Sequence, residues 1–424
     1  MRIEQHSIDQ HNNRLYEDHL LRLEQLFTLR PSARRLLPLL EAFQIAIPSW
    51  ALGAGGTRFG RFSIGGEPGS LEQKLEDIGV LHALNRSSGA ISLHIPWDIP
   101  TDPAAIRTLA QSLDIRFDAV NSNTFQDQPG QSHSYKFGSL QHVSADVRKQ
   151  AIAHNIEVMQ YGKELGSTAL TVWLSDGSNF PGQLNFRKAF QHVHDSLAEV
   201  YQSLPSDWKL LIEYKACEPN FYSMTVGDWG QSYLLANKLG NKAFTLVDLG
   251  HHLPNANIEQ IVSVLLMEKK LGGFHFNDSK YGDDDLTVGS IHPYQLFLIF
   301  QELVEGMNAQ SMNHASDLSW MIDASHNIKD PLEDLLQSVE AIQLAYAQAL
   351  LVDADALESA RIANDTVLAQ EILQDAFRTD VRPLLAEARR NKGGSLNPLR
   401  LYRELNVREV LINERGVVSK ATGL

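Results

Sequence analysis

Four acidic or imidazole side chains occur in the second half of the 424-residue sequence, each near the end of a short apolar run. They are Glu213, Asp248, His275 and Asp323. Carboxylates and imidazoles are the ligands that Mn²⁺, Mg²⁺, Co²⁺ and Zn²⁺ take in mixed oxygen and nitrogen sites. One such carboxylate alone often pairs with Lys or Arg, but burying four of these groups together without a cation would be strongly unfavourable. The set therefore predicts a divalent-cation site.

A second group of the same kind lies next to the first in the sequence. His251 follows Asp248 by three residues, and Asp283 and Asp285 belong to the run NDSKYGDDDL at 277–286. Alternating aspartates can direct two carboxylates toward one ion while the middle residue, Asp284, points away. Most acidic loops are simply solvated, but this one directly follows His275, and Glu213 could bridge to a second ion. We therefore expect a second divalent cation.

Aromatic and polar side chains accompany these groups at other strand ends. Trp50, Trp97, Phe125 and Trp173 could shape a pocket for the apolar face of a sugar, or could be ordinary packing residues. His94 and Lys215 could hydrogen-bond sugar hydroxyls or relay protons. Lys215 could equally be a structural partner of Glu213 or Asp248.

Eight short runs rich in β-branched and aromatic residues must position these side chains. They cover residues 45–50, 91–97, 117–123, 169–176, 209–215, 244–251, 272–278 and 318–326. Amphipathic stretches lie between them, for example 144–167 and 256–272. This alternation predicts an α/β fold, and eight strands favour a closed (β/α)8 TIM barrel over an open doubly wound sheet. In such a barrel the carboxyl ends of the strands meet at one rim, where active sites lie.

The ends of the chain have little strand character. We divide it into an N-terminal helical segment (1–40), a catalytic barrel (41–330) and a C-terminal helical extension (331–424). The apolar faces of the terminal helices can pack on their own barrel or on a neighbouring subunit.

Composition excludes several classes of function. The net charge is −14 and basic residues do not cluster, which argues against a nucleic-acid partner. There is no signal-like start and no apolar run of roughly 20 residues, so we expect a cytoplasmic protein without a membrane partner. The single cysteine, Cys217, excludes an intrachain disulfide and a thiolate metal cluster. Phosphate-loop, dinucleotide-binding, HExxH and GxSxG patterns are missing in the required context.

Longer motifs resemble one known family. The segments IPSW, GGTRFGRF, SLHIPWD, NSNTFQD, GQSHSYKFGSL, LTVWLSDGSNFPGQ, VDLGHH, GGFHFNDSKYGDDDL, MIDASHN and AYAQALL, between about Ile47 and Arg390, resemble the bacterial L-rhamnose isomerases, particularly the branch with broad aldose specificity. The resemblance implies two cations per subunit, usually Mn²⁺. A structural ion would be held by Glu213, Asp248, His275 and Asp323, and a catalytic ion would lie near His251, Asp283 and Asp285.

The resemblance also implies an assembly and one local difference. It implies a homotetramer in which the loop around Phe59 reaches the active site of a neighbouring subunit. Where the family often has a histidine between the Glu and Lys of the fifth strand, this chain has Tyr214. On an alternating strand Tyr214 should point away from Glu213 and Lys215, and it can alter hydrogen bonding behind the ligands.

The implied reaction is the interconversion of L-rhamnose and L-rhamnulose, and of related aldoses, by metal-assisted transfer of hydrogen between C1 and C2. A hydride shift and an enediol route both stay open. The candidate catalytic groups are Lys215, Asp323 and His94, with a water molecule on the metal as another proton relay. Two alternatives remain: a metal-dependent phosphodiester hydrolase on the same fold, which would need a basic rim, and a non-catalytic sugar-binding barrel.

Overall fold

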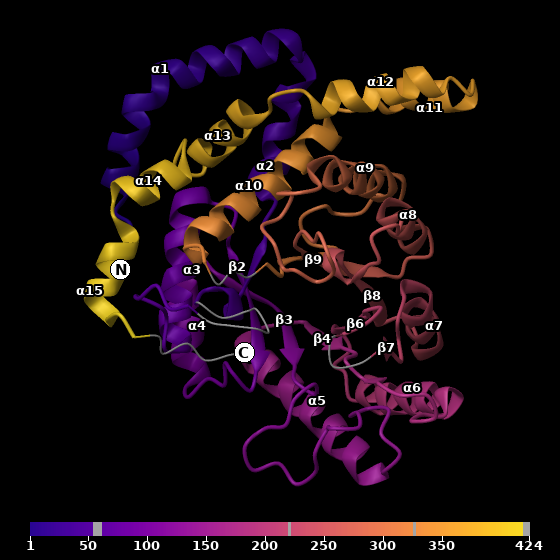
Figure 1. The fold of residues 1–424 in the computed structure, drawn as a ribbon. Helices are drawn as coiled ribbons and strands as arrows, with labels where there is room; N and C mark the ends of the chain where they lie inside the picture. Colours follow the sequence, from indigo (N-terminus) through magenta and orange to yellow (C-terminus); the bar gives the residue numbers. More distant parts are fainter. Residues whose placement is uncertain (54–61, 219–221, 325–327, 419–424) are drawn as a thin grey trace.

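A computed structural model describes residues 1–53, 62–218, 222–324 and 328–418, and its centre is a closed barrel of eight parallel strands (Figure 1). The strands are β1 (Ala46–Pro48), β2 (Ala90–Ile95), β3 (Arg116–Ser122), β4 (Ala169–Trp173), β6 (Lys209–Glu213), β8 (Ala243–Asp248), β9 (Leu271–Phe276) and β10 (Ser319–Ile322). They pair in chain order, and β1 closes the barrel against β10. The predicted (β/α)8 TIM barrel is therefore confirmed, with each strand in its expected region.

Each barrel strand is followed by a helix that packs outside it. These helices are α3 (Leu71–Asn85), α4 (Pro103–Ser112), α5 (Ala145–Leu165), α6 (Phe186–Gln202), α7 (Trp229–Leu239), α8 (Ile258–Met267), α9 (Pro293–Ala309) and α10 (Pro331–Leu350). Local sequence sets their ends. The Asn257 side chain accepts the Gln260 N–H at the start of α8, and Gly166 ends α5 in the left-handed conformation at φ 97°.

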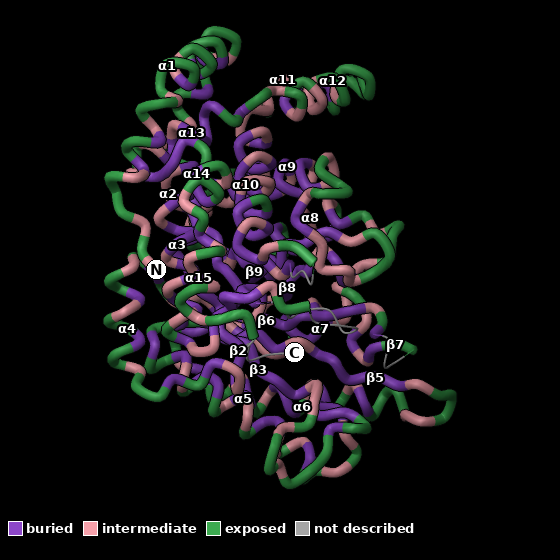
Figure 2. Tube along the Cα trace, turned by 60° about the vertical axis from the view of Figure 1, so that its left-hand side comes forward, coloured by how far each residue is buried: buried purple, intermediate pink, exposed green. Residues whose placement is uncertain are grey.

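Helices at both ends of the chain pack together beside the barrel. The N-terminal ones are α1 (Gln5–Leu29), the 3₁₀ helix η1 (Pro31–Leu36) and α2 (Leu37–Ala42). The C-terminal ones are α11 (Ala354–Ile362), α12 (Thr366–Phe377), α13 (Arg382–Asn391), α14 (Pro398–Glu404) and α15 (Val407–Arg415). One hydrophobic cluster joins Ile8 of α1 and Leu411 of α15 to Ile47 of the barrel, so these terminal helices bury apolar surface on their own chain. Helices α11 and α12 project from the body and are largely exposed (Figure 2).

The sequence division at residues 40 and 330 stays a prediction, although α10 follows β10 as the eighth barrel helix.

In the described part of the chain no single helix is long and apolar enough to cross a membrane. Helices α10 and α11 are long and apolar enough only when they are taken together, and the chain bends by 65° between them.

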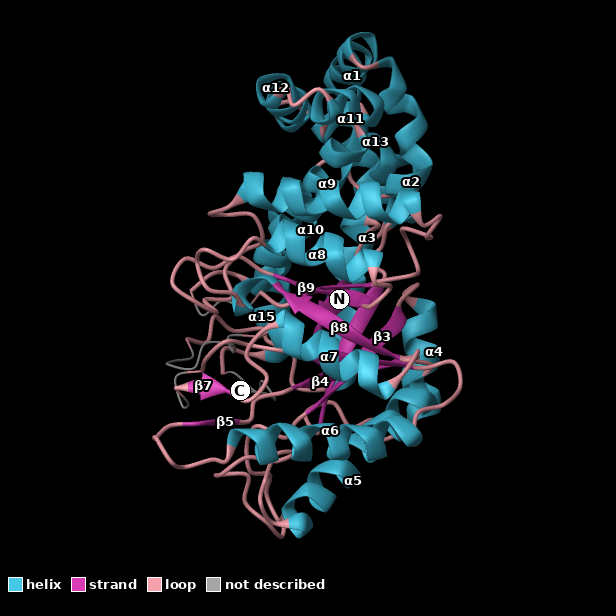
Figure 3. Cartoon of the chain, turned by 90° about the vertical axis from the view of Figure 1, so that its right-hand side faces the viewer, coloured by secondary structure: helices cyan, strands magenta, loops and turns pink. Residues whose placement is uncertain are grey.

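Loops gather at one end of the barrel, together with a short antiparallel pair that the sequence did not predict (Figure 3). This pair joins β5 (Gly177–Ser178) to β7 (Ser223–Met224) and so links the segments that follow β4 and β6. The predicted strands also extended too far. For example, β1 ends at Pro48, and Trp50 lies in the 3₁₀ helix η2 (Ser49–Ala51). The residues beyond each barrel strand therefore belong to the loops that lie at this end of the barrel.

Candidate active site

The predicted first group of ligands comes together at the rim. Asp248 stands opposite His275 where β8 pairs with β9, and Glu213 ends the neighbouring strand β6. Asp323 follows β10 and is tied to β9 by its backbone N–H, which donates to the Phe276 carbonyl at 2.8 Å. One ligand atom from each of Glu213, Asp248, His275 and Asp323 lies within 4.8 Å of the others.

His275 is at the centre of this group. Its Nδ1 lies 3.1 Å from Glu213 Oε1, 3.6 Å from Asp323 Oδ2 and 3.7 Å from Asp248 Oδ2. The outer oxygen of Asp248, Oδ1, accepts the Gly250 N–H at 2.8 Å and the Asn277 amide at 2.9 Å. Its inner oxygen, Oδ2, is buried and has no hydrogen-bond partner among the described residues. Burying a carboxylate oxygen without a hydrogen-bond partner costs free energy unless a cation binds it, so this set of ligand atoms fits a divalent ion.

Burial and mutual charge perturb the acid–base equilibria of the group. Burial raises the pKa of Asp323 to about 7 and also raises the pKa of Asp248. Burial opposes protonation of His275, but the surrounding carboxylates of Glu213, Asp323 and Asp248 together outweigh it and raise the histidine pKa to about 9. Burial acts to raise the pKa of Glu213, but His275 and His251 together lower it below its usual value. Without a cation, protons would partly neutralise the cluster.

A second group lies against the first. Ligand atoms of Asp248, His251 and Asp283 are within 4.8 Å of one another. His251 Nδ1 faces the Tyr214 carbonyl at 3.0 Å, which directs Nε2 toward Asp283 Oδ1 at 3.3 Å. That orientation is typical of a metal-binding histidine. The residue common to both groups is Asp248, whereas the sequence suggested Glu213 as the bridge.

The acidic loop has the predicted alternation. Asp283 and Asp285 both adopt left-handed backbone conformations, at φ 52° and 50°, and both line the same pocket. Asp284 between them accepts backbone N–H groups of the loop itself, from Lys280 at 2.7 Å and Tyr281 at 2.8 Å. Asp285 is not part of the compact second group, so its place as a ligand stays a prediction.

Lys215 lies beside the second group and is almost completely buried. Its ammonium forms ion pairs with Asp283 and Glu218, neither of which the sequence suggested as its partner. It also lies 5.5 Å from the centre of the Trp173 ring. Lys215 therefore connects the acidic loop to the aromatic side of the pocket.

The predicted aromatic residues form the opposite wall of the pocket. His94 stacks on Trp97 with ring centres 3.9 Å apart, and Phe125 and Trp173 are 4.8 Å apart. Trp50 donates its indole N–H to Asp323 Oδ1 at 2.9 Å. Burial lowers the pKa of His94 to about 3, so its ring is neutral at physiological pH, and its Nδ1 has no partner in the described structure. Phe59 and His326 lie outside the described residues.

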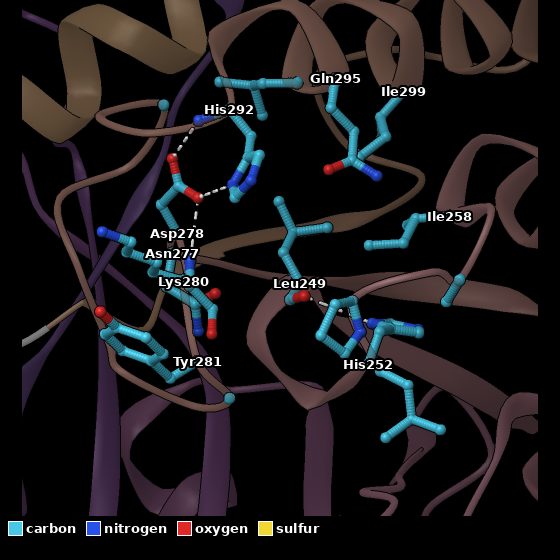
Figure 4. A pocket seen from close by; sticks show the side chains of 17 residues that line it. Leu249, His252, Ile258, Asn277, Asp278, Lys280, Tyr281, His292, Gln295 and Ile299 are labelled. Carbon is cyan, nitrogen blue, oxygen red and sulfur yellow. Dashed lines mark hydrogen bonds and ion pairs between the residues drawn. The ribbon is translucent and has the colours of Figure 1, made fainter.

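Two other acids that follow barrel strands accept hydrogen bonds from loop residues and do not belong to either group of candidate ligands. Asp176 accepts the backbone N–H groups of Ser139 and Gln141, both at 2.7 Å. Asp278 accepts the Ile291 N–H and pairs with His292 at 2.8 Å, beside a separate cavity (Figure 4). Both carboxylates are used to hold loop backbone.

Sequence reasoning missed several supporting residues. Lys74 of α3 contacts Asp98 at 2.6 Å, and the Asp98 carboxylate also accepts the His94 backbone N–H at 2.8 Å. Ser122 lines the pocket as well. The acid at the end of the run HIPWD was a visible signal for Asp98, whereas no pattern marked Lys74 or Glu218.

The fold and the site together define a (β/α)8-barrel protein with a candidate divalent-cation centre under an aromatic-walled pocket. The chain is 53% identical over 382 residues to a probable sugar isomerase of Rhizobium meliloti strain 1021, covering 90% of this chain and 88% of the relative. It is equally similar, 53% over 383 residues with the same coverage, to a probable sugar isomerase of Mesorhizobium japonicum. The chain therefore belongs to this family of probable sugar isomerases. No family model matches the sequence.

Solved structures of sugar-converting enzymes share the fold at low sequence identity. An L-ribulose 3-epimerase aligns with a TM-score of 0.52 at 14% identity, covering 77% of this chain and 98% of its own. A xylose isomerase domain protein of Alicyclobacillus acidocaldarius aligns with a TM-score of 0.51 at 12% identity, covering 73% and 99%. At these identities the likeness concerns the barrel alone.

Proposed function

We propose that the protein is a divalent-cation-dependent aldose–ketose isomerase that interconverts L-rhamnose and L-rhamnulose and accepts related aldoses. The observation that carries this proposal is the buried group around Asp248 Oδ2, which lies at the floor of a pocket with aromatic walls. Membership in the sugar isomerase family supports the reaction type. The choice of L-rhamnose depends on the motif resemblance.

The chemistry supplied by a bound divalent cation is Lewis-acid polarisation of a sugar oxygen. Glu213, Asp248, His275 and Asp323 would hold one ion, and His251 and Asp283 would hold a second together with Asp248. Mn²⁺ is the expected metal, with Co²⁺, Mg²⁺ and Zn²⁺ as alternatives.

The chain's own side chains orient the sugar and exclude water. Trp97, Phe125 and Trp173 offer flat faces to the apolar side of the ring. His94 lines the pocket and is neutral, so its ring can exchange a hydrogen bond with a sugar hydroxyl and relay a proton there. Lys215 pairs with the Asp283 carboxylate and lies 5.5 Å from the centre of the Trp173 ring, so it holds the acidic loop against the aromatic wall.

The test begins with metal removal. Protein stripped with EDTA should lose ketose formation and regain it when Mn²⁺, Co²⁺, Mg²⁺ or Zn²⁺ is restored singly, with L-rhamnose, L-mannose, L-lyxose, D-allose and D-ribose as substrates. Absence of activity on every sugar with every metal would refute the proposal. Sugar binding without ketose formation would support the non-catalytic alternative.

A matched pair of variants separates the cation site from a general effect of removing a buried acid. Asp248→Asn keeps the shape of the side chain but removes the negative charge from the carboxylate whose Oδ2 has no hydrogen-bond partner among the described residues. It should abolish activity. Asp278→Asn makes the same change at the end of the adjacent β9, where the carboxylate serves His292, and it should stay active. Equal losses in both variants would contradict the assignment of Asp248.

Two further features can be tested on the same protein. The hydrolase alternative would need a basic rim, and the described lining of the pocket contains no Lys or Arg. The route of hydrogen transfer is tested by running the reaction in deuterated water and measuring deuterium at C1 of the product. Extensive solvent deuterium there excludes a pure hydride shift.

We also propose a cytoplasmic homotetramer, which light scattering and cell fractionation would test.

A further inference from the structure

Two consecutive histidines follow β8, and only the first is part of the candidate metal centre. His251 directs Nε2 toward Asp283, and it is the last residue of the 3₁₀ helix η3 (Leu249–His251). His252 turns the other way, toward Tyr214. Tyr214 is the position at which the sequence departs from the family motif, and the reaction described above leaves its phenol unused.

Tyr214 contacts both histidines. Its hydroxyl lies 2.7 Å from His252 Nε2, and its backbone carbonyl lies 3.0 Å from His251 Nδ1. His252 Nδ1 faces the Leu249 carbonyl at 3.4 Å, so Nδ1 carries the proton and Nε2 accepts from the phenol. The Tyr214 and His252 rings meet edge to face at 85°, with their centres 5.4 Å apart. Tyr214 is 1% exposed and His252 is partly exposed, so this hydrogen bond is partly buried.

The segment that carries the two histidines borders two cavities. A cavity of ≈ 470 Å³ lies on one side of it, lined by Tyr214, His251 and His252 among others. A second cavity of ≈ 90 Å³ is lined by Leu249, His252 and the acidic loop (Figure 4). Leu253, the next residue, is 59% exposed. His251 is buried and Leu249 packs on the core, whereas His252 borders open space, so the hydrogen bond to Tyr214 is a main contact that fixes the His252 side of this turn.

We propose that the Tyr214–His252 hydrogen bond positions His251 and thereby sets the cation affinity of the group formed by Asp248, His251 and Asp283. Tyr214 and His252 are positioning residues, because neither supplies an atom to the group. The inference rests on the cation centre of the proposed function. It goes beyond that function by assigning a role to a side chain outside the ligand set.

Tyr214→Phe is the direct test, because it deletes the hydroxyl and keeps the ring. The chain offers a matched control in Tyr346 of α10, which is also buried and whose hydroxyl lies 3.0 Å from His314 Nδ1. His314 precedes β10, at the end of the barrel opposite the rim. Tyr346→Phe therefore removes a tyrosine–histidine hydrogen bond of the same kind far from the metal centre.

The measurement is calorimetric titration of EDTA-stripped protein with Mn²⁺. Asp323→Asn and Asp283→Asn assign the binding events, because Asp323 belongs to the first group alone and Asp283 to the second alone. Tyr214→Phe should weaken the second-group event by about 10-fold, the lower end for residues that orient metal ligands, and leave the first unchanged. With Co²⁺, the visible absorption of the second-group ion should shift. His252→Leu should weaken the same event, which covers the case of a poorly folded Tyr214 variant.

Three results would overturn the proposal: Tyr214→Phe with both affinities at wild-type values, equal weakening of both events, or equal weakening by Tyr346→Phe. A wild-type titration with a single event would overturn it too, since no second group would exist to position. A wild type that binds two ions but forms no ketose refutes only the proposed reaction, because the positioning role is measured by binding.

Discussion

Substituting the buried ion pair between Lys74 and Asp98 tests how the aromatic side of the pocket is held. Lys74 Nζ and Asp98 Oδ1 are 2.6 Å apart, and their side chains are 3% and 0% exposed. The same carboxylate accepts from the Ser49 hydroxyl and from the His94 backbone N–H. It thereby joins α3 to the residue before Trp50 and to the end of β2. Asp98→Asn keeps the shape of the side chain and removes its charge.

The expected cost follows from burial. Removing one partner of a buried pair leaves an uncompensated charge and costs about 3–5 kcal/mol. Unfolding entropy is about 2.1 cal/mol/K per residue, so for 424 residues 1 kcal/mol corresponds to about 1 °C in Tm. Asp98→Asn and Lys74→Met should each lower Tm by about 3–5 °C. The double variant should recover part of this loss, because no charge is then buried alone.

The assay combines thermal melting, near-ultraviolet circular dichroism and sugar kinetics. Because Asp98 holds the segments that carry Trp50 and His94, the tryptophan dichroism should change and KM should rise more than kcat falls. Asp380→Asn is the control, since the Asp380–Arg382 pair is 49% and 66% exposed and should contribute less than about 1 kcal/mol. Additive Tm losses in the Lys74→Met/Asp98→Asn double variant would refute the reasoning.

Three other substitutions have distinct expected outcomes. Trp50→Phe removes the donor to Asp323 Oδ1 and should weaken only the first cation, by about 10-fold in calorimetry; an unchanged affinity would contradict this. Asn277→Ala removes a donor to Asp248, which both groups share, and should weaken both cations; a selective loss would argue against a shared ligand. Burial raises the pKa of Asp77 to about 6, so the folded protein binds this proton more tightly than the unfolded chain does. The stability of the wild type relative to Asp77→Asn should therefore fall as pH rises from about 4 to about 6, and a pH-independent difference in Tm would contradict it.

The barrel and the first ligand group were predictable because their signals are local. Each strand is an apolar run that ends in a polar residue, and the rim of a parallel barrel brings such ends together. Glu213, Asp248 and His275 therefore lie where the sequence placed them. The exact strand ends were not predictable, since the turn at Trp50 depends on bonds to residues far away in the sequence, including Asp323.

The role of an individual acid was harder to predict. Asp176, Asp278 and Asp248 all follow apolar strands, and the pattern does not distinguish them. Loop backbone N–H groups reach both oxygens of Asp176 and Asp278, but only one oxygen of Asp248. Which acid keeps an oxygen for a cation depends on how the loops fold over the rim. The partners of Lys215 were missed for the same reason.

The site divides between the two halves of the barrel, and closure of the barrel joins them. The candidate cation ligands lie at or just beyond the ends of β6, β8, β9 and β10, whereas the aromatic wall lies at or just beyond the ends of β1 to β4. The halves meet where β1 pairs with β10 and where β4 pairs with β6. At the first seam Trp50 bonds Asp323, and at the second Trp173 stands opposite Glu213.

An open sheet of the same strands would leave β1 and β10 at opposite edges, so the bond between Trp50 and Asp323 could not form. In the closed order the aromatic wall and the candidate cation ligands are brought into contact at these two seams. Phe125 packs on Trp173 at the second seam, with ring centres 4.8 Å apart, so we expect a substitution there to change the pocket wall and to reach the cation site only through Trp173. A substitution at Trp50 acts on the pocket and on the cation site together, because the same indole lines the pocket and holds the Asp323 carboxylate.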